Sequence, residues 1–170
     1  MKPRAWLAVI LAVGTGGGLM NASARADAPA GRFVDNGDGT VTDQETKLVW
    51  QQTASLASVV WSQAVADCSS NVAGLPGSGW RLPNVKELAT LVDRSREFPA
   101  IDEAYFFGAY DPGGTTDDFW SATCYQPGPG WAACPEQYSK AWTVEFRGGQ
   151  IQSFNSAGNG TTVGRMRCVR

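Results

Sequence analysis

Four cysteines and no histidine constrain the folded form of this 170-residue chain more than any other feature. The cysteines are Cys68, Cys124, Cys134 and Cys168, and no two of them form a Cys-x-x-Cys pair. Zinc sites are built mostly from closely spaced cysteines and histidines, so the sequence does not favour a zinc site. In an exported chain, an even number of cysteines favours disulfide bonds. Four cysteines permit three pairings, and the residues alone do not choose among them.

The first 26 residues have the pattern of a secretory signal peptide. Lys2 and Arg4 precede an apolar stretch from Ala5 to Val13, and Ala24-Arg25-Ala26 supplies a small-residue cleavage site. The apolar stretch is shorter than the ~20 residues that a transmembrane helix requires. We therefore expect an exported product, periplasmic or extracellular, with no membrane span in the mature chain.

After the signal peptide, residues 27–31 are expected to form a short flexible leader and residues 32–170 a single domain. Cleavage would remove three of the 14 Lys and Arg residues and none of the 16 Asp and Glu residues, which leaves a net charge of about −5. Nucleic-acid binding requires a strongly basic face, and this composition does not supply one. We expect no nucleic-acid partner.

Paired strands are predicted at both ends of the domain. Arg32–Gln51 alternates in the manner of strands and turns at Asn36-Gly37-Asp38-Gly39, where Asn-Gly and Asp-Gly tolerate positive φ. Later strands are predicted at Asp118–Tyr125, Ala141–Phe146, Gln150–Phe154 and Val163–Val169.

Two helices are predicted between these groups of strands. Apolar residues recur at helical spacing over 58–71, with Ser58 as the N-cap and Cys68 on the buried face. The second helix begins after Asn84, with Glu87 in the position that completes a capping box. Strands, two helices and further strands indicate an α+β fold.

Trp80-Arg81-Leu82-Pro83 is the most distinctive stretch of the chain. Trp80 and Leu82 are expected to pack in the core, and Pro83 stiffens the entry into the second helix. A charged residue flanked by core residues is usually paired internally, so Arg81 is predicted to hold buried carboxylates or carbonyls. We predict a structural role for this motif, for Glu87 and for Trp120.

The sequence carries no recognisable catalytic pattern. Without histidine, the commonest general base and the Ser-His and Cys-His pairs are missing. Asp117-Asp118 and Asp102-Glu103 are adjacent carboxylates of the kind that usually lie solvated at the surface. We therefore expect no enzymatic activity, no cofactor and no metal site.

Short motifs follow one another in a recurrent order along residues 31–170. They are Arg32-Phe33, Asn36-Gly37-Asp38-Gly39-Thr40-Val41, Leu48-Val49-Trp50, Trp80-Arg81-Leu82-Pro83 with Glu87-Leu88, Phe119-Trp120-Ser121 and Arg167-Cys168-Val169-Arg170. This joint pattern resembles the Lcl C-terminal domain family, named after the carboxyl-terminal domain of a Legionella collagen-like adhesin. Each motif alone is weak, whereas their order is specific.

The resemblance implies a C-type lectin-like fold, related to that of the formylglycine-generating enzyme, with two helices packed on short antiparallel sheets. It also implies that Cys68 bonds Cys168 and that Cys124 bonds Cys134. The name-giving domain is linked to binding sulfated glycosaminoglycans, an activity that an acidic chain does not favour.

Two family features do not carry over to this chain. It has no collagen-like repeat, so the trimerisation that such a repeat drives is not implied and the oligomeric state stays open. Gln126-Pro127 is followed by Gly128, where a carboxylate would complete the calcium motif of sugar-binding C-type lectins. Calcium-dependent sugar binding is therefore not favoured.

The resemblance places a ligand surface in the loops between Cys124 and Tyr138 and between Asn155 and Thr162. Flat apolar rings and amide groups suit a sugar, which stacks and forms hydrogen bonds. Arg147 and Arg165 would add positive charge if they face the same side. In the alternative interpretation, Trp131 only closes the base of a hairpin. The candidate ligand-binding residues are Tyr125, Trp131, Tyr138, Arg147, Asn155, Asn159 and Arg165.

Two functional classes follow from these observations. The first is a binding module that recognises a glycan or a protein at a cell surface or in a matrix, as an adhesin does. The second is a structural or envelope-associated domain that makes protein contacts without binding saccharides.

Overall fold

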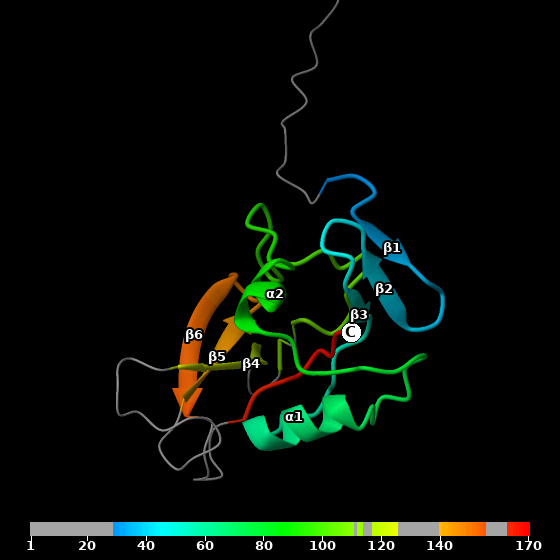
Figure 1. The fold of residues 1–170 in the computed structure, drawn as a ribbon. Helices are drawn as coiled ribbons and strands as arrows, with labels where there is room; N and C mark the ends of the chain where they lie inside the picture. The colour runs from blue at the N-terminus through cyan, green and yellow to red at the C-terminus, as the bar shows by residue number, and fades with distance from the viewer. Residues whose placement is uncertain (1–28, 111, 114–116, 126–139, 156–162) are drawn as a thin grey trace, which may run out of the picture.

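A computed structural model describes residues 29–110, 112–113, 117–125, 140–155 and 163–170. In these ranges the chain forms two three-stranded antiparallel sheets and two helices, which is the predicted α+β class. The two sheets lie on opposite sides of the molecule, and the last residues of the chain run between them (Figure 1). The predicted signal peptide lies outside the described residues and stays a prediction.

The first sheet is the hairpin region predicted from the sequence. Its three strands, in the order β1-β2-β3, are β1 (Phe33–Asp35), β2 (Thr40–Asp43) and β3 (Val49–Gln51). The turn between the first two strands places Gly37 and Gly39 at φ values of 73° and 83°, a conformation that glycine adopts without strain. The Asp35 side chain accepts a hydrogen bond from the Gly37 N–H at 2.8 Å, which closes the turn locally.

The second sheet is formed by the late strands. In the order β4-β5-β6, they are β4 (Asp118–Tyr125), β5 (Lys140–Glu145) and β6 (Gln150–Asn155). Gly149, in the turn between β5 and β6, has a φ of 75°, and a Cβ there would lie 2.6 Å from the Val92 side chain. This close contact with the segment after the second helix requires glycine.

The first helix, α1 (Trp61–Ser69), begins later than predicted, and the assignment of Ser58 as its N-cap is wrong. The N-cap is Val60, which makes no side-chain capping bond. Val59 exchanges backbone hydrogen bonds with Gly164, at 2.8 and 3.0 Å, so the chain is held extended until residue 60. A partner more than 100 positions away in the sequence therefore sets the start of this helix.

The second helix, α2 (Val85–Ala89), begins as predicted. The Asn84 side chain accepts from the Glu87 N–H at 2.9 Å, and the Glu87 carboxylate accepts from the Asn84 N–H at 2.8 Å. This reciprocal pair is the predicted capping box. The helix is only one and a half turns long, but Leu88 and Leu91 are both buried in the core below it.

The final segment, residues 163–170, does not form the strand predicted at Val163–Val169. Instead it makes single β-bridges to four different parts of the chain: Gly164 to Val59, Arg165 to Phe119, and Val169 to both Trp50 and Arg81. A regular strand needs several successive bonds to one neighbour, and this segment changes neighbour every few residues. It therefore links both sheets and the Trp80 motif.

One disulfide joins α1 to this final segment. Cys68 and Cys168 are bonded, as the family resemblance implied, and both are buried. The predicted partner of Cys124, Cys134, lies outside the described residues, so the second pairing stays a prediction. Cys124 itself lies in β4 and is not a free thiol.

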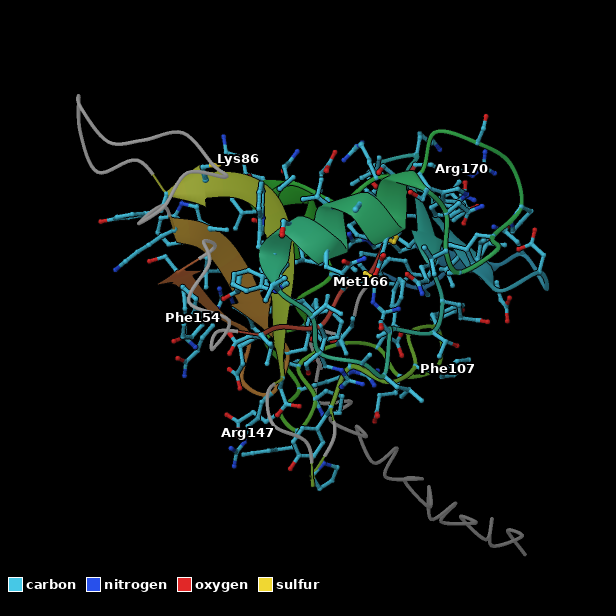
Figure 2. All side chains as sticks on the ribbon, turned by 90° about the horizontal axis from the view of Figure 1, so that it is seen from below. Lys86, Phe107, Arg147, Phe154, Met166 and Arg170 are labelled. Carbon is cyan, nitrogen blue, oxygen red and sulfur yellow. A yellow bond between two sulfur atoms is a disulfide. The ribbon has the colours of Figure 1, made fainter. Side chains whose placement is uncertain are left out.

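The core consists of two apolar clusters. One cluster joins the first sheet, α2 and the second sheet and includes Trp50, Leu88, Phe106, Phe119 and Phe146. The other lies around the disulfide and includes Trp61, Trp80, Leu82, Trp120 and Met166. The side chains in Figure 2 fill the space between the ribbons of Figure 1.

Candidate functional site

The apolar residues of the Trp80-Arg81-Leu82-Pro83 motif are packed in the interior. Trp80, Leu82 and Pro83 are buried, and the Trp80 indole donates to the Pro76 carbonyl at 3.1 Å. Trp120 is fully buried and donates to the Val59 carbonyl at 2.9 Å. These contacts agree with the structural role predicted for these aromatic residues.

Arg81 is paired as predicted, but its partner does not lie in the core. The guanidinium holds both oxygens of Glu87, at 2.8 and 2.7 Å, and the Arg81 side chain is 45% exposed. The Glu87 side chain is 20% exposed, so the partner is only partly buried and the prediction of a buried partner holds only in part. Arg81 lowers the pKa of Glu87 through these hydrogen bonds, opposed by burial and supported by the Asn84 backbone. The pair thus fixes the carboxylate that caps α2.

The predicted ligand surface is described only in part. Trp131, Tyr138 and Asn159 lie outside the described residues. Tyr125 and Asn155 lie in the second sheet, in one row with Lys140 between them, because Tyr125 pairs with Lys140 and Lys140 pairs with Asn155. This row is at the end of the sheet from which the predicted loops leave.

An aromatic pair marks this end of the sheet. The Tyr125 and Trp142 rings meet edge to face with centroids 5.2 Å apart, and the Lys140 ammonium lies 6.0 Å from the Tyr125 centroid. All three side chains are only partly buried. We call Tyr125, Lys140 and Trp142 the loop-end surface. Trp142 was not among the predicted site residues.

Arg165 does not belong to an exposed basic surface. Its side chain is 3% exposed and donates from Nε to the Ser55 carbonyl at 3.2 Å. Its guanidinium carbon lies 5.7 Å from the centroid of the Phe119 ring. The expectation that Arg165 adds charge to the ligand surface is therefore wrong, because its extended segment directs it into the core.

Arg167, two residues further on, is also buried. It donates to the carbonyl oxygens of Gln51, Gln52 and Phe107, and its guanidinium lies near the Phe106 and Phe119 rings. Burial lowers the pKa of Arg167 to about 9, and the charge of Arg165 lowers it further in the same direction. Arg167 is thus charged at neutral pH and is held by backbone dipoles.

Arg147 lies at the opposite end of the second sheet from the loop-end surface. It follows β5 directly, in the turn that the Glu145–Gln150 pair closes. The structure therefore does not bring Arg147 together with Tyr125 and Asn155. Figure 2 shows Arg147 projecting from one extremity of the molecule.

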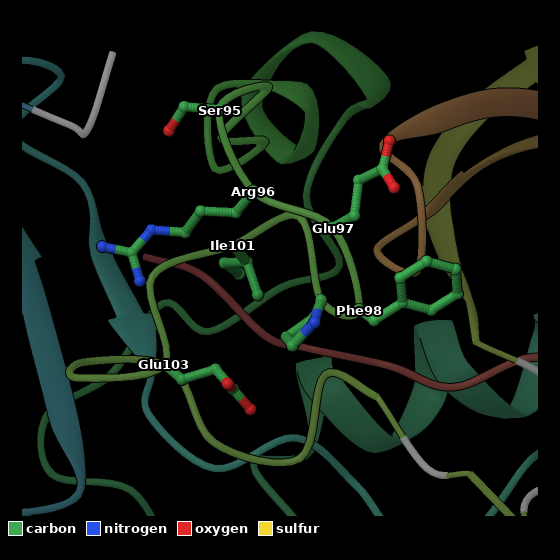
Figure 3. Close-up of a pocket in the computed structure, with 7 residues that line it drawn as sticks. Ser95, Arg96, Glu97, Phe98, Ile101 and Glu103 are labelled. Carbon is green, nitrogen blue, oxygen red and sulfur yellow. The ribbon is translucent and has the colours of Figure 1, made fainter. Parts of the chain in front are cut away.

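Two adjoining pockets lie beside Arg147. Their volumes are about 380 and 390 Å³. They share Glu97 and Phe98, and Figure 3 shows these two side chains on the side of the loop away from Arg96. We call the two pockets together the Phe98 cleft. Its remaining lining residues are Ser95, Arg96, Pro99, Ile101 and Glu103 in the first pocket and Glu145, Arg147, Gly148 and Gln150 in the second.

Phe98 is held at the surface by its backbone. Its N–H donates to the Arg147 carbonyl at 2.9 Å, and the Ala100 N–H donates to the Phe146 carbonyl at 2.6 Å. Phe98 has a φ of 57°, which is uncommon for a bulky residue, and its side chain is 53% exposed. An exposed ring held in this conformation is a feature that functional sites share.

Sequence reasoning missed the Phe98 cleft apart from Arg147. A single phenylalanine before a proline carries no signal of exposure, since phenylalanine is usually buried. The acidic residues of the cleft come from segments separated by more than 40 positions. The one available signal was the apolar Phe98 directly after the polar stretch Arg94–Glu97.

No metal centre or membrane span is found in the part of the chain that the structure describes. No group of three or more His, Cys, Asp and Glu side chains there is arranged to hold a metal ion. None of the described helices is long and apolar enough to cross a bilayer.

Comparisons with known proteins give one finding. No curated protein and no solved structure matches the chain, so the C-type lectin-like fold stays a prediction. Residues 39–170 match the Lcl C-terminal domain, which covers most of the chain, including the capping box, the disulfide, the second sheet and strands β2 and β3 of the first sheet. The protein therefore belongs to the Lcl C-terminal domain family.

Proposed function

We propose that this protein is an exported, non-catalytic binding module that recognises a glycan or a protein at a cell surface or in an extracellular matrix. Membership of the Lcl C-terminal domain family supports a binding role in general terms. Within that role, we assign glycan recognition to the loop-end surface and the loops that leave it.

The observation that carries this proposal is the partly exposed Tyr125–Trp142 pair. Aromatic rings in this arrangement expose apolar faces on which a sugar ring stacks, and the Tyr125 hydroxyl and Trp142 N–H can bond its hydroxyl groups. Both residues lie on hydrogen-bonded strands, so their positions are fixed by the sheet. A rigid aromatic surface loses little conformational entropy when a ligand binds.

Export is supported by two features. The first 26 residues have the charged, apolar and small-residue parts of a signal peptide. The Cys68–Cys168 disulfide is buried and fits an oxidising compartment such as the periplasm or the extracellular medium.

A non-catalytic role is supported by the composition of the chain. It contains no histidine, so a general base would have to come from a carboxylate, lysine, tyrosine or cysteine. The described carboxylates with lowered pKa, among them Asp43, Glu87 and Asp93, are bonded to structural partners. These groups serve folding in the arrangement described above.

The proposal is tested on a glycan array, followed by binding measurements on variants. We expect a saccharide-selective signal from the folded protein. Trp142→Ala and Tyr125→Ala should each weaken binding by about two- to tenfold, since an aromatic stacking contact contributes about 0.5–1.5 kcal/mol. Trp131→Ala and Tyr138→Ala extend the same measurement to the predicted loop.

Ile151→Ala is the matched control. Ile151 is a 44% exposed apolar residue of β6 that pairs with Val144, towards the other end of the sheet. We expect this variant to bind as the parent does, with thermal unfolding measured for every variant beside binding. If the Trp142 and Tyr125 variants are folded and still bind the glycan, the binding site lies elsewhere on the protein. If the array gives no selective signal, the second functional class is favoured, a domain that makes protein contacts without binding saccharides.

A further inference from the structure

The Phe98 cleft has a charge pattern of its own. Of its two arginines, Arg96 is already paired, with Asp93 at 3.0 Å and Asp102 at 3.6 Å. Arg147 forms no ion pair with any carboxylate among the described residues. Three carboxylates line the cleft, and Glu97, shared by the two pockets, is exposed. The unpaired charge of the cleft is therefore predominantly negative.

The exposed Phe98 ring already has a positively charged group beside it, the Arg147 guanidinium. The Arg147 guanidinium lies 5.1 Å from the centroid of the Phe98 ring, a distance at which the ring attracts a positive charge. The edge of the Phe98 ring meets Tyr110, with centroids 6.0 Å apart. A cation from outside can approach the exposed part of the ring in the same way, and it would compete there with Arg147.

The surroundings of Glu145 strengthen the negative potential. Burial raises the pKa of Glu145, and the charges of Asp118 and Asp117 raise it further, whereas the Gly148 N–H and Arg147 lower it. Asp118 pairs with Glu145 across β4 and β5, which explains the repulsion between their carboxylates. A second positive charge in the cleft would relieve this repulsion.

We infer that the Phe98 cleft binds a basic peptide segment of a protein partner, with a lysine or arginine side chain against the Phe98 ring and beside Glu97 and Glu145. The two pockets favour an extended chain, because Glu103 lies in one, Glu145 in the other and Glu97 in both. A peptide with several positive charges meets carboxylates along its whole length. The site is distinct from the loop-end surface and does not depend on glycan binding there.

The test uses a fluorescein-labelled hexalysine peptide and fluorescence anisotropy with the folded full chain at low and at physiological salt. We expect saturable binding that weakens as salt is raised, because salt screens exposed charges. Phe98→Ala should weaken binding by about two- to fivefold through loss of an exposed cation–π contact. Glu97→Gln should weaken it as well, and it leaves the backbone hydrogen bonds of the loop in place.

Arg147→Gln gives the decisive measurement. It removes the internal cation from the ring and from Glu145, so we expect the hexalysine peptide to bind more tightly than to the parent. Lys86→Gln removes the same charge from an exposed residue of α2, which Figure 2 shows at the opposite extremity of the molecule. That variant should leave the affinity unchanged, as should Asp67→Asn, which removes a partly exposed carboxylate from α1.

Three outcomes would overturn the inference. Weaker binding in Arg147→Gln would mean that Arg147 does not compete with the peptide for the Phe98 ring and the carboxylates. Equal losses in Glu97→Gln and Asp67→Asn would mean that the peptide responds only to the net charge of the chain. Absence of saturable binding would leave the cleft without this ligand. Trp142→Ala is expected to bind the peptide normally, so failure of the glycan proposal leaves this result intact.

Discussion

Arginine has two different environments in this domain, one at the surface and one in the core. At the surface, Arg81 holds both oxygens of Glu87 and is itself 45% exposed. In the core, Arg165 and Arg167 are buried, and neither forms an ion pair within the described ranges. Arg167 bonds instead to carbonyl oxygens at the end of β3, residues 51–52, and to that of residue 107.

The difference shows what each guanidinium contributes. Arg81 fixes the position of the Glu87 carboxylate at the surface. The pair therefore orients the cap of α2 and contributes little to the free energy of unfolding. In the core, a carbonyl that has no sheet partner needs a donor, and a guanidinium supplies several donors in one rigid plane. Arg167 therefore acts as a cross-link between the two segments that it bonds, and the nearby aromatic faces of Phe106 and Phe119 favour its charge.

The largest effect is expected at Arg167. Arg167→Met should lower the free energy of unfolding by about 3–5 kcal/mol, because three hydrogen bonds from a charged donor are lost together. The Gln52 and Phe107 carbonyls keep one backbone donor each, the N–H groups of Phe107 and Ala54, whereas the Gln51 carbonyl loses its guanidinium donor. Arg167→Lys should rescue little, since an ammonium cannot reach all three oxygens in one plane. Urea denaturation measures the change. Arg170→Met, on an exposed residue of the same segment, is the control, and equal stability of the two variants would refute the cross-link.

A smaller effect is expected at Arg165. It makes one carbonyl bond, to Ser55, so Arg165→Met should cost about 1–2 kcal/mol. Because the charge of Arg165 lowers the pKa of Arg167, its removal also relieves repulsion between the two cations. The double variant should therefore lose less than the two single variants added together. A double-mutant cycle by urea denaturation measures this coupling, and strict additivity would contradict it.

Arg81 should matter less again. Arg81→Ala is expected to cost below about 1 kcal/mol, as exposed ion pairs do. Glu87→Gln keeps the capping residue type and loses the charge, whereas Glu87→Ala loses both. We expect Glu87→Ala to be the least stable of these three variants by thermal unfolding. If Arg81→Ala loses as much stability as Arg167→Met, then the surface and core arginines do not differ in what they contribute.

The smallest effect is a dependence on pH. The folded pKa of Glu87 lies below its ordinary value of 4.5, so its contribution is fully present above that pH and is lost as the pH falls through the folded pKa. The difference in unfolding free energy between the parent and Glu87→Gln should therefore be constant near neutral pH and shrink below about pH 4.5. Urea denaturation at a series of pH values measures it, and a difference that grows on acidification would contradict the lowered pKa.

Local sequence patterns predicted the elements that depend on local contacts. The turn at residues 36–39 and the capping box of Asn84 and Glu87 are each closed by bonds within four positions. The start of α1 could not be predicted in this way, because Gly164 holds Val59 extended. The Cys68–Cys168 bond was implied by the family resemblance and not by the spacing of the cysteines.

The candidate sites were harder to predict than the fold. Arginine is usually exposed, so nothing in the sequence placed Arg165 and Arg167 in the core. Arg147 was expected to add positive charge to the ligand surface if it faced the same side, yet the hairpin separates it from Asn155 by the length of β6. Phe98 and Glu145 meet only because the loop around residue 98 is bonded to the end of β5.

The β-bridges of residues 164–169 determine when the domain can complete its folding. During synthesis the chain emerges from its N-terminus, so the residues of β1 to β3 and of both helices are made before residues 164–169. Trp50, Val59 and Arg81 must wait for partners that are about 90 to 120 positions further along the chain. Contacts of such long sequence separation slow folding, because a large loop has to close before they form. The early half of the domain is thus exposed, with its core uncovered, until the last few residues arrive.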